Sequence, residues 1–70
     1  MERKAVRSGS IASVGYDARN KTLEVEFRHG GVYQYAGVPE KRYQSLMKVS
    51  AIGHYFTTDI SPSYGCGKVG

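Results

Sequence analysis

The sequence predicts an α+β fold in one small domain: a three-stranded antiparallel β-meander packed on one face by two short C-terminal α-helices. The 70 residues leave room for one compact core, because a chain of this size buries only about 60% of its unfolded surface. Apolar and polar side chains alternate before residue 36, which indicates strands, and the apolar spacing becomes three and four after Pro39, which indicates helices.

The first predicted strand covers residues 10–16, which are rich in β-branched and aromatic side chains. Its buried face stays open, because Ile11, Val14 and Tyr16 do not share one parity along the strand. Residues 17–21 contain Asp and Asn and predict the turn that follows.

The alternation is clearest in residues 22–28. Leu23, Val25 and Phe27 occupy one face and charged side chains occupy the other, which is typical of a half-buried antiparallel strand. A glycine-containing turn follows, and residues 32–35 form the returning strand.

Two registers of this hairpin compete, and they differ in the face that carries Tyr33 and Tyr35. A two-residue turn at 29–30 places both rings on the polar face, as an exposed aromatic platform of the kind that stacks bases. A three-residue loop at 28–30, with Gly30 in the left-handed bulge position, places both rings in the core. The core register is favoured, because so small a chain needs its large rings in the interior.

The first helix begins near Pro39, whose missing N–H costs nothing in a first helical turn. Tyr43, Leu46 and Met47 share its apolar face, and charged residues occupy the other side.

Ser50 predicts the N-cap of a second short helix. Ile52, Tyr55 and Phe56 form the apolar side of this helix. Gly53 lowers helix propensity, so we interpret it as a position of close packing.

Both ends of the chain are expected to be flexible: a basic N-terminal tail at 1–7 and a C-terminal tail at 65–70 enclose a single domain at 8–64. The lone Cys66 excludes an internal disulfide and hence a disulfide-stapled secreted mini-protein. No apolar run approaches the roughly 20 residues of a membrane helix, and no signal peptide is visible. We therefore expect a cytoplasmic protein without a membrane partner.

The net charge of +4 is compatible with an anionic partner, either nucleic acid or a phosphorylated small molecule. About half of this excess lies in residues 1–7. The alternative interpretation is a surface that is basic only for solubility.

No residue pattern predicts catalysis, and we expect no enzyme activity, no catalytic residue, no metal site and no cofactor. Cys66 lies in a glycine-flanked segment with no base fixed nearby by the sequence. His29 and His54 have no Cys, Asp or Glu at metal-ligand spacing. There is no phosphate-binding Walker loop.

An ordered set of residues resembles the KTSC domain over about residues 6–64. The family is named for its place at the C-terminus of some lysyl-tRNA synthetases, and it also occurs as small stand-alone proteins in bacteria and their viruses. The resemblance implies a compact non-catalytic domain, for which RNA binding has been suggested from the synthetase context. The matching residues are Ser10, Gly15-Tyr16-Asp17, Leu23-x-Val25-x-Phe27, Gly30, Tyr33-x-Tyr35, Val38-Pro39, Tyr43-x-x-Leu46, Ser50-x-x-Gly53-x-Tyr55-Phe56 and Ile60.

We expect a non-enzymatic binding module for RNA or another phosphate-bearing ligand, acting through cationic attraction and tyrosine contacts. The alternatives are a small homo-oligomer that sequesters a nucleotide-like molecule between subunits, and a protein-interaction module that uses the sheet edge or polar sheet face. The candidate ligand-binding residues are Arg28, His29, Tyr33, Tyr35, Lys41, Arg42 and His54.

Overall fold

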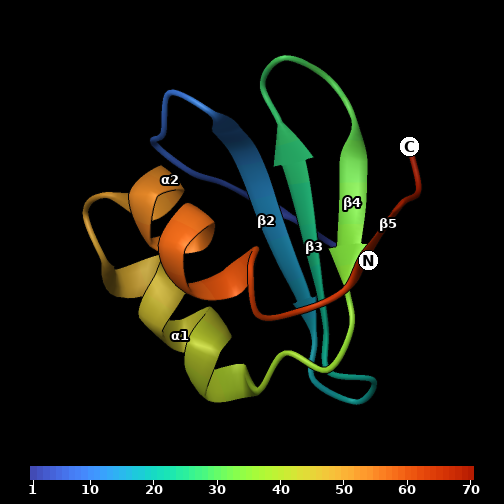
Figure 1. Ribbon diagram of the computed structural model, residues 1–70. Helices are drawn as coiled ribbons and strands as arrows, with labels where there is room; N and C mark the ends of the chain where they lie inside the picture. The colour runs from blue at the N-terminus through green and yellow to red at the C-terminus, as the bar shows by residue number, and fades with distance from the viewer.

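The computed structural model describes residues 1–70, which form a five-stranded antiparallel sheet with two helical segments on one face. The strands follow one another across the sheet in chain order (Figure 1). Their bounds are β1 (Lys4–Ala5), β2 (Ile11–Asp17), β3 (Thr22–Phe27), β4 (Val32–Tyr35) and β5 (Cys66–Lys68).

The α+β class is confirmed, but the predicted sheet of three strands is too narrow. Residues 4–5 and 66–68, which the sequence predicts to lie in flexible tails, pair with the two sides of the predicted meander. Both edge strands are very short, and all of their residues are exposed. They therefore lack the apolar alternation by which a half-buried strand is recognised in a sequence.

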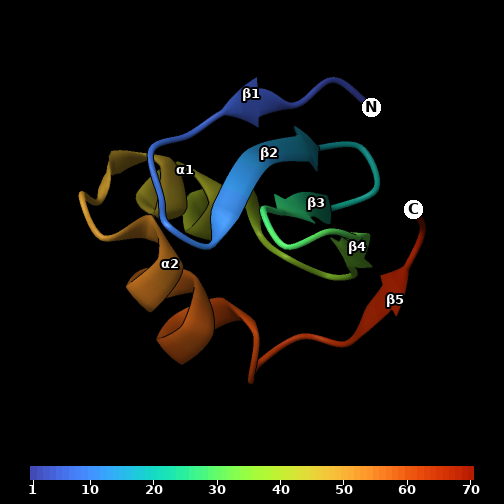
Figure 2. The same ribbon diagram turned by 90° about the horizontal axis from the view of Figure 1, so that it is seen from above.

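The helical part consists of α1 (Glu40–Lys48) and α2 (Ile52–Tyr55), and α2 continues without a break into the π-helical turn η1 (Phe56–Ile60). Figure 2 shows both helices on one side of the sheet and both chain ends on the other. No helix has the length and apolar character required to span a membrane.

The second helix differs from its prediction in two respects. Ala51 occupies the N-cap position and no side chain caps the helix, so the predicted Ser50 cap is wrong. The helix also widens: the Ser61 N–H donates to the carbonyl of Phe56 at 2.8 Å. The hydroxyl groups of Thr57 and Thr58 donate to backbone carbonyls one turn earlier at 2.9 and 3.0 Å, a bond that competes with regular helical geometry.

A β-bulge in β2 explains the conflicting parity of the first strand. The register with β3 shifts between Ile11 and Ser13, so that one extra residue enters β2. As a consequence, each of the three residues Ile11, Val14 and Tyr16 pairs with an apolar residue of β3, and all three lie on the same face of the sheet as those partners. A single irregularity thus reconciles three residues that a regular strand cannot place on one face.

The core register of the β3–β4 hairpin is confirmed. Val25 pairs with Tyr33 and Leu23 pairs with Tyr35. Gly30 has a φ of 116°, a backbone conformation that residues with a side chain rarely adopt.

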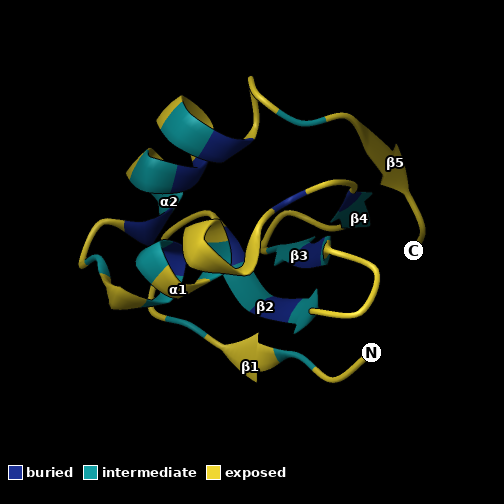
Figure 3. Cartoon of the chain, turned by 90° about the horizontal axis from the view of Figure 1, so that it is seen from below, coloured by how far each residue is buried: buried dark blue, intermediate teal, exposed yellow.

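The core lies between the central strands and the helices (Figure 3). Tyr16 of β2 stacks on Tyr43 of α1, with ring centroids 4.9 Å apart, and its hydroxyl donates to the carbonyl of Val38 at 2.5 Å. These contacts fix α1 against the sheet. The buried hydrophobic residues are Ile11, Val14, Leu23, Val25, Tyr35, Val38, Leu46, Ile52, Phe56 and Ile60.

Candidate functional site

A single open pocket of about 670 Å³ lies between the segment that precedes β2 and the start of α2. Its walls are mainly small and hydroxyl-bearing side chains, with one cation and one histidine among them. The lining residues are Arg7, Ser8, Gly9, Ser10, Ser50, Ala51, Ile52, Gly53, His54 and Thr57.

The two walls of the pocket approach each other most closely at Gly53 of α2 and the serines that precede β2. A Cβ added at Gly53 would lie 2.7 Å from the Ser10 Oγ and 3.2 Å from the Ser8 Oγ, so only glycine fits without a shift of the opposite wall. The Ser8 Oγ also accepts the N–H groups of Ser10 and Ile11, both at 3.3 Å. The predicted close packing at Gly53 is confirmed.

Arg28 stabilises the same wall from the β3–β4 hairpin. Its Nε donates to the carbonyl of Ser8 at 2.5 Å and its Nη2 to the carbonyl of Val6 at 3.1 Å. Its backbone N–H donates to the carbonyl of Ser10 at 2.9 Å. Arg28, which the sequence predicts to contact the ligand, therefore supports the pocket wall. Two of its guanidinium nitrogen atoms already donate hydrogen bonds to the protein itself.

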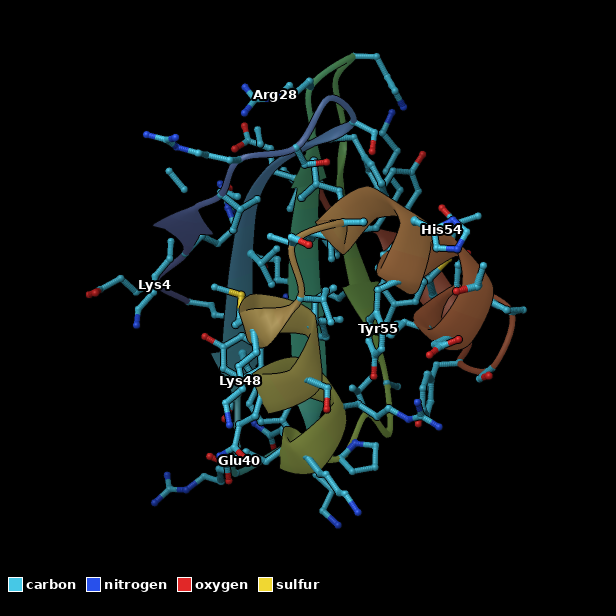
Figure 4. All side chains as sticks on the ribbon, turned by 90° about the vertical axis from the view of Figure 1, so that its left-hand side faces the viewer. Lys4, Arg28, Glu40, Lys48, His54 and Tyr55 are labelled. Carbon is cyan, nitrogen blue, oxygen red and sulfur yellow. The ribbon has the colours of Figure 1, made fainter.

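His54 is the predicted site residue that the structure places in the pocket, where it is exposed on α2 (Figure 4). Arg7 reaches the same pocket from a segment that the sequence analysis assigns to a flexible tail. The two residues are far apart in the sequence, so no local pattern joins them. The sequence signal that points to Arg7 is the positive charge of residues 1–7. This charge does not indicate where in the fold Arg7 lies.

Lys41 and Arg42 are not brought together with Arg28. They lie in the first turn of α1 next to Glu40, at the end of the molecule opposite Arg28 (Figure 4). Arg42 donates to the Tyr55 hydroxyl at 3.3 Å and pairs with Asp59 at 3.7 Å, which ties α1 to the second helical segment. Lys41 is exposed.

The predicted tyrosines belong to an aromatic cluster on the helix side of the sheet. Tyr35 is 4% exposed, and its ring forms a T-shaped contact with that of Phe56, with centroids 5.1 Å apart. Burial is the main cause that raises the pKa of Tyr35 to about 12. Tyr33 is only half-buried. Tyr35 is therefore unavailable for base stacking.

A polar network on the other face of the sheet escaped the sequence analysis. Glu24, expected to face solvent, is 6% exposed. Its carboxylate accepts a hydrogen bond from Gln34 at 2.9 Å and forms an ion pair with Arg3. The hydrogen bond from Gln34, followed by that from Arg3, lowers the pKa of Glu24 against the opposing effect of burial. Arg3 also donates to Ser13 at 2.9 Å.

Cys66 is exposed on β5, where it pairs with Tyr35 of β4. No three His, Cys, Asp or Glu side chains come together in an arrangement suited to a metal ion.

Comparison with known proteins gives the same architecture. The model of the KTSC domain matches residues 7–64. The crystal structure of the KTSC domain protein YPO2434 from Yersinia pestis is 42% identical, with a TM-score of 0.95 over 99% of this chain and 97% of that chain. An uncharacterized protein from Stutzerimonas stutzeri is 38% identical over 64 residues, or 91% of this chain and 90% of the relative. The chain belongs to the KTSC family.

Proposed function

We propose that this protein is a non-enzymatic binding module for a phosphate-bearing ligand, and that the phosphate group occupies the pocket between residues 7–10 and α2. The observation that carries the proposal is the lining of this pocket: Arg7 and His54 stand beside four hydroxyl-bearing residues. Arginine and hydroxyl groups are the usual donors to phosphate oxygens. The net charge of +4 favours the approach of such an anion.

Arg7 and the serine hydroxyls are the pocket donors that remain for a ligand, because the Thr57 hydroxyl already donates to the carbonyl of Gly53 at 2.9 Å. Arg7 is exposed and forms no ion pair within 4.0 Å, in contrast to Arg3 and Arg42. The Ser8 Oγ already contacts the backbone of its own loop, which fixes its position. A fixed donor loses little conformational freedom when a ligand binds.

A compact ligand fits the geometry better than an extended RNA strand. Tyr35 is buried in the core, and Arg28 and Arg42 donate to groups of the protein itself. The cations and rings that a strand would follow are therefore mostly occupied. RNA carries the same phosphate chemistry, so a short RNA belongs in the test.

Isothermal titration calorimetry at low ionic strength tests the proposal, with inorganic pyrophosphate and a single-stranded oligouridine as probes. We expect pyrophosphate to bind and Arg7→Gln to weaken its binding about tenfold, the loss expected for one charge-assisted contact. Arg19→Gln is the matched control: it removes the same charge from the β2–β3 turn, at the opposite end of the sheet (Figure 1). Absence of pyrophosphate binding, or equal weakening by both variants, contradicts the proposal.

A further inference from the structure

An aromatic corner, formed by Phe27, His29 and Tyr33, lies at the β3–β4 hairpin. The rings of Phe27 and His29 are nearly parallel, with an interplanar angle of 7° and centroids 5.6 Å apart. Tyr33 meets Phe27 edge-on, with centroids also 5.6 Å apart. His29 is exposed, and Phe27 is the ring that stacks on it.

This corner is supported by the core. Phe56 packs edge-on against Phe27, with centroids 5.7 Å apart, and also against the buried Tyr35 at 5.1 Å. The position of Phe27 is therefore determined by three other rings. Phe27 in turn stacks on His29, so it provides a fixed support for the imidazole on which a planar group would stack.

The aromatic corner and the pocket share structural elements. Arg28, between Phe27 and His29, holds the pocket wall through its hydrogen bonds to the carbonyls of Ser8 and Ser10. Phe56, which contacts Phe27, is followed in the chain by Thr57 of the opposite pocket wall. The two features therefore lie toward the same end of the molecule and are linked through Arg28 and through the Phe56–Thr57 step (Figure 1).

A second free cation accompanies the corner. The side chain of Lys68 extends toward the hairpin and lies beside Tyr33. A Cβ added at Gly31 would be 3.6 Å from the Cε of Lys68 and 3.1 Å from the ring of Tyr33. Lys68 forms no ion pair within 4.0 Å. The corner thus combines an open aromatic ring with a positive charge, and the neighbouring pocket adds Arg7.

We propose that the ligand is a free nucleotide, with its phosphate in the pocket and its base stacked on His29; this assignment rests on the function proposed above. A nucleotide joins an anionic group and a planar aromatic group within one small molecule, which is the combination that the pocket and the aromatic corner present together. Base stacking on aromatic side chains tolerates different bases, so the corner selects the nucleotide class and no particular base.

Titration calorimetry with AMP, ribose 5-phosphate and adenosine separates the two sites. We expect AMP to bind at least about fivefold more tightly than ribose 5-phosphate, the smallest gain typical of one stacked base. His29→Ser should abolish this preference and leave the affinity for ribose 5-phosphate unchanged. His29→Phe, which keeps a ring at the same position, should retain the preference.

The outcomes distinguish this assignment from the function on which it rests. If ribose 5-phosphate and AMP bind equally, the phosphate pocket stands and the base site is wrong. If neither binds, the proposed function itself fails. If His29→Ser keeps the preference for AMP, the base lies elsewhere. If a ten-nucleotide oligoadenylate binds more than about tenfold more tightly than AMP, the ligand is a strand and the assignment to a free nucleotide is contradicted.

Discussion

Single residues decide which side chains this domain can offer to a ligand. Gly30 adopts a left-handed conformation and thereby sets the register that turns Tyr33 and Tyr35 toward the helices. This register could be predicted because turn chemistry and core volume favour the same loop. The burial of Glu24 could not be predicted, because it depends on Arg3, and Arg3 reaches the Glu24 carboxylate from a segment distant in the sequence.

Replacing Tyr35 by alanine tests the core register. Because its ring is almost fully buried against Phe56, we expect Tyr35→Ala to lower the free energy of unfolding by about 3–5 kcal/mol. Urea denaturation followed by circular dichroism measures this change. Tyr33→Ala, at the half-buried partner position, should cost clearly less; equal stability of wild type and Tyr35→Ala would mean that the ring is not part of the core.

The Glu24 carboxylate gives the stability of the protein a defined pH dependence. Its pKa is lowered below the ordinary 4.5, so its contribution is complete above that pH and is lost as the pH falls through the folded-state value. We expect Glu24→Gln to lose about 1.5–3 kcal/mol near neutral pH, with the difference from wild type disappearing once the pH falls below the lowered folded-state pKa of Glu24. Thermal unfolding at a series of pH values measures it.

Glu40→Gln serves as the control for this pH series, because Glu40 is exposed and forms no ion pair within 4.0 Å. A difference between wild type and Glu24→Gln that stays constant down to the lowest pH would show that the carboxylate charge is not the cause.

At the level of elements, the central strands and α1 follow their sequence patterns, whereas the edges and the second helix depart from them. The position of strand β1 cannot be recognised in its own residues, because it depends on how closely the N-terminal segment approaches Gly15 of β2. A Cβ at Gly15 would lie 2.6 Å from the carbonyl oxygen of Glu2. The N-terminal segment can cross β2 only where a side chain is missing. The resemblance to the KTSC family includes Gly15 but does not reveal this reason.

Substitution of Gly15 should detach the N-terminal segment. In Gly15→Ala the new methyl group collides with backbone, so we expect β1 to leave the sheet while the core remains folded. Limited trypsin digestion should then cleave after Lys4 much faster than in wild type, with near-native thermal unfolding. Gly67→Ala in β5, where nothing lies within 4 Å, should leave the cleavage rate unchanged. Unchanged cleavage in Gly15→Ala would contradict this role.

At the scale of the whole molecule, basic residues are spread over the surface, but their surroundings differ. Lys4, Lys41 and Lys48 are exposed on strand or helix surfaces, where charge aids solubility. Arg7 lies with His54 in a pocket that two distant segments form together. No sequence pattern could place this pocket, because its existence depends on how the segment before β2 packs against Gly53.

A nuclear magnetic resonance titration of the ¹⁵N-labelled protein with inorganic pyrophosphate tests the central claim most directly, because every backbone amide of the molecule reports at once. We expect chemical-shift changes to concentrate at residues 7–10 and 50–57 and to saturate with a single dissociation constant. Changes that concentrate around Lys41 and Lys48 on α1, or that spread over all basic surfaces and vanish at moderate salt, would contradict it.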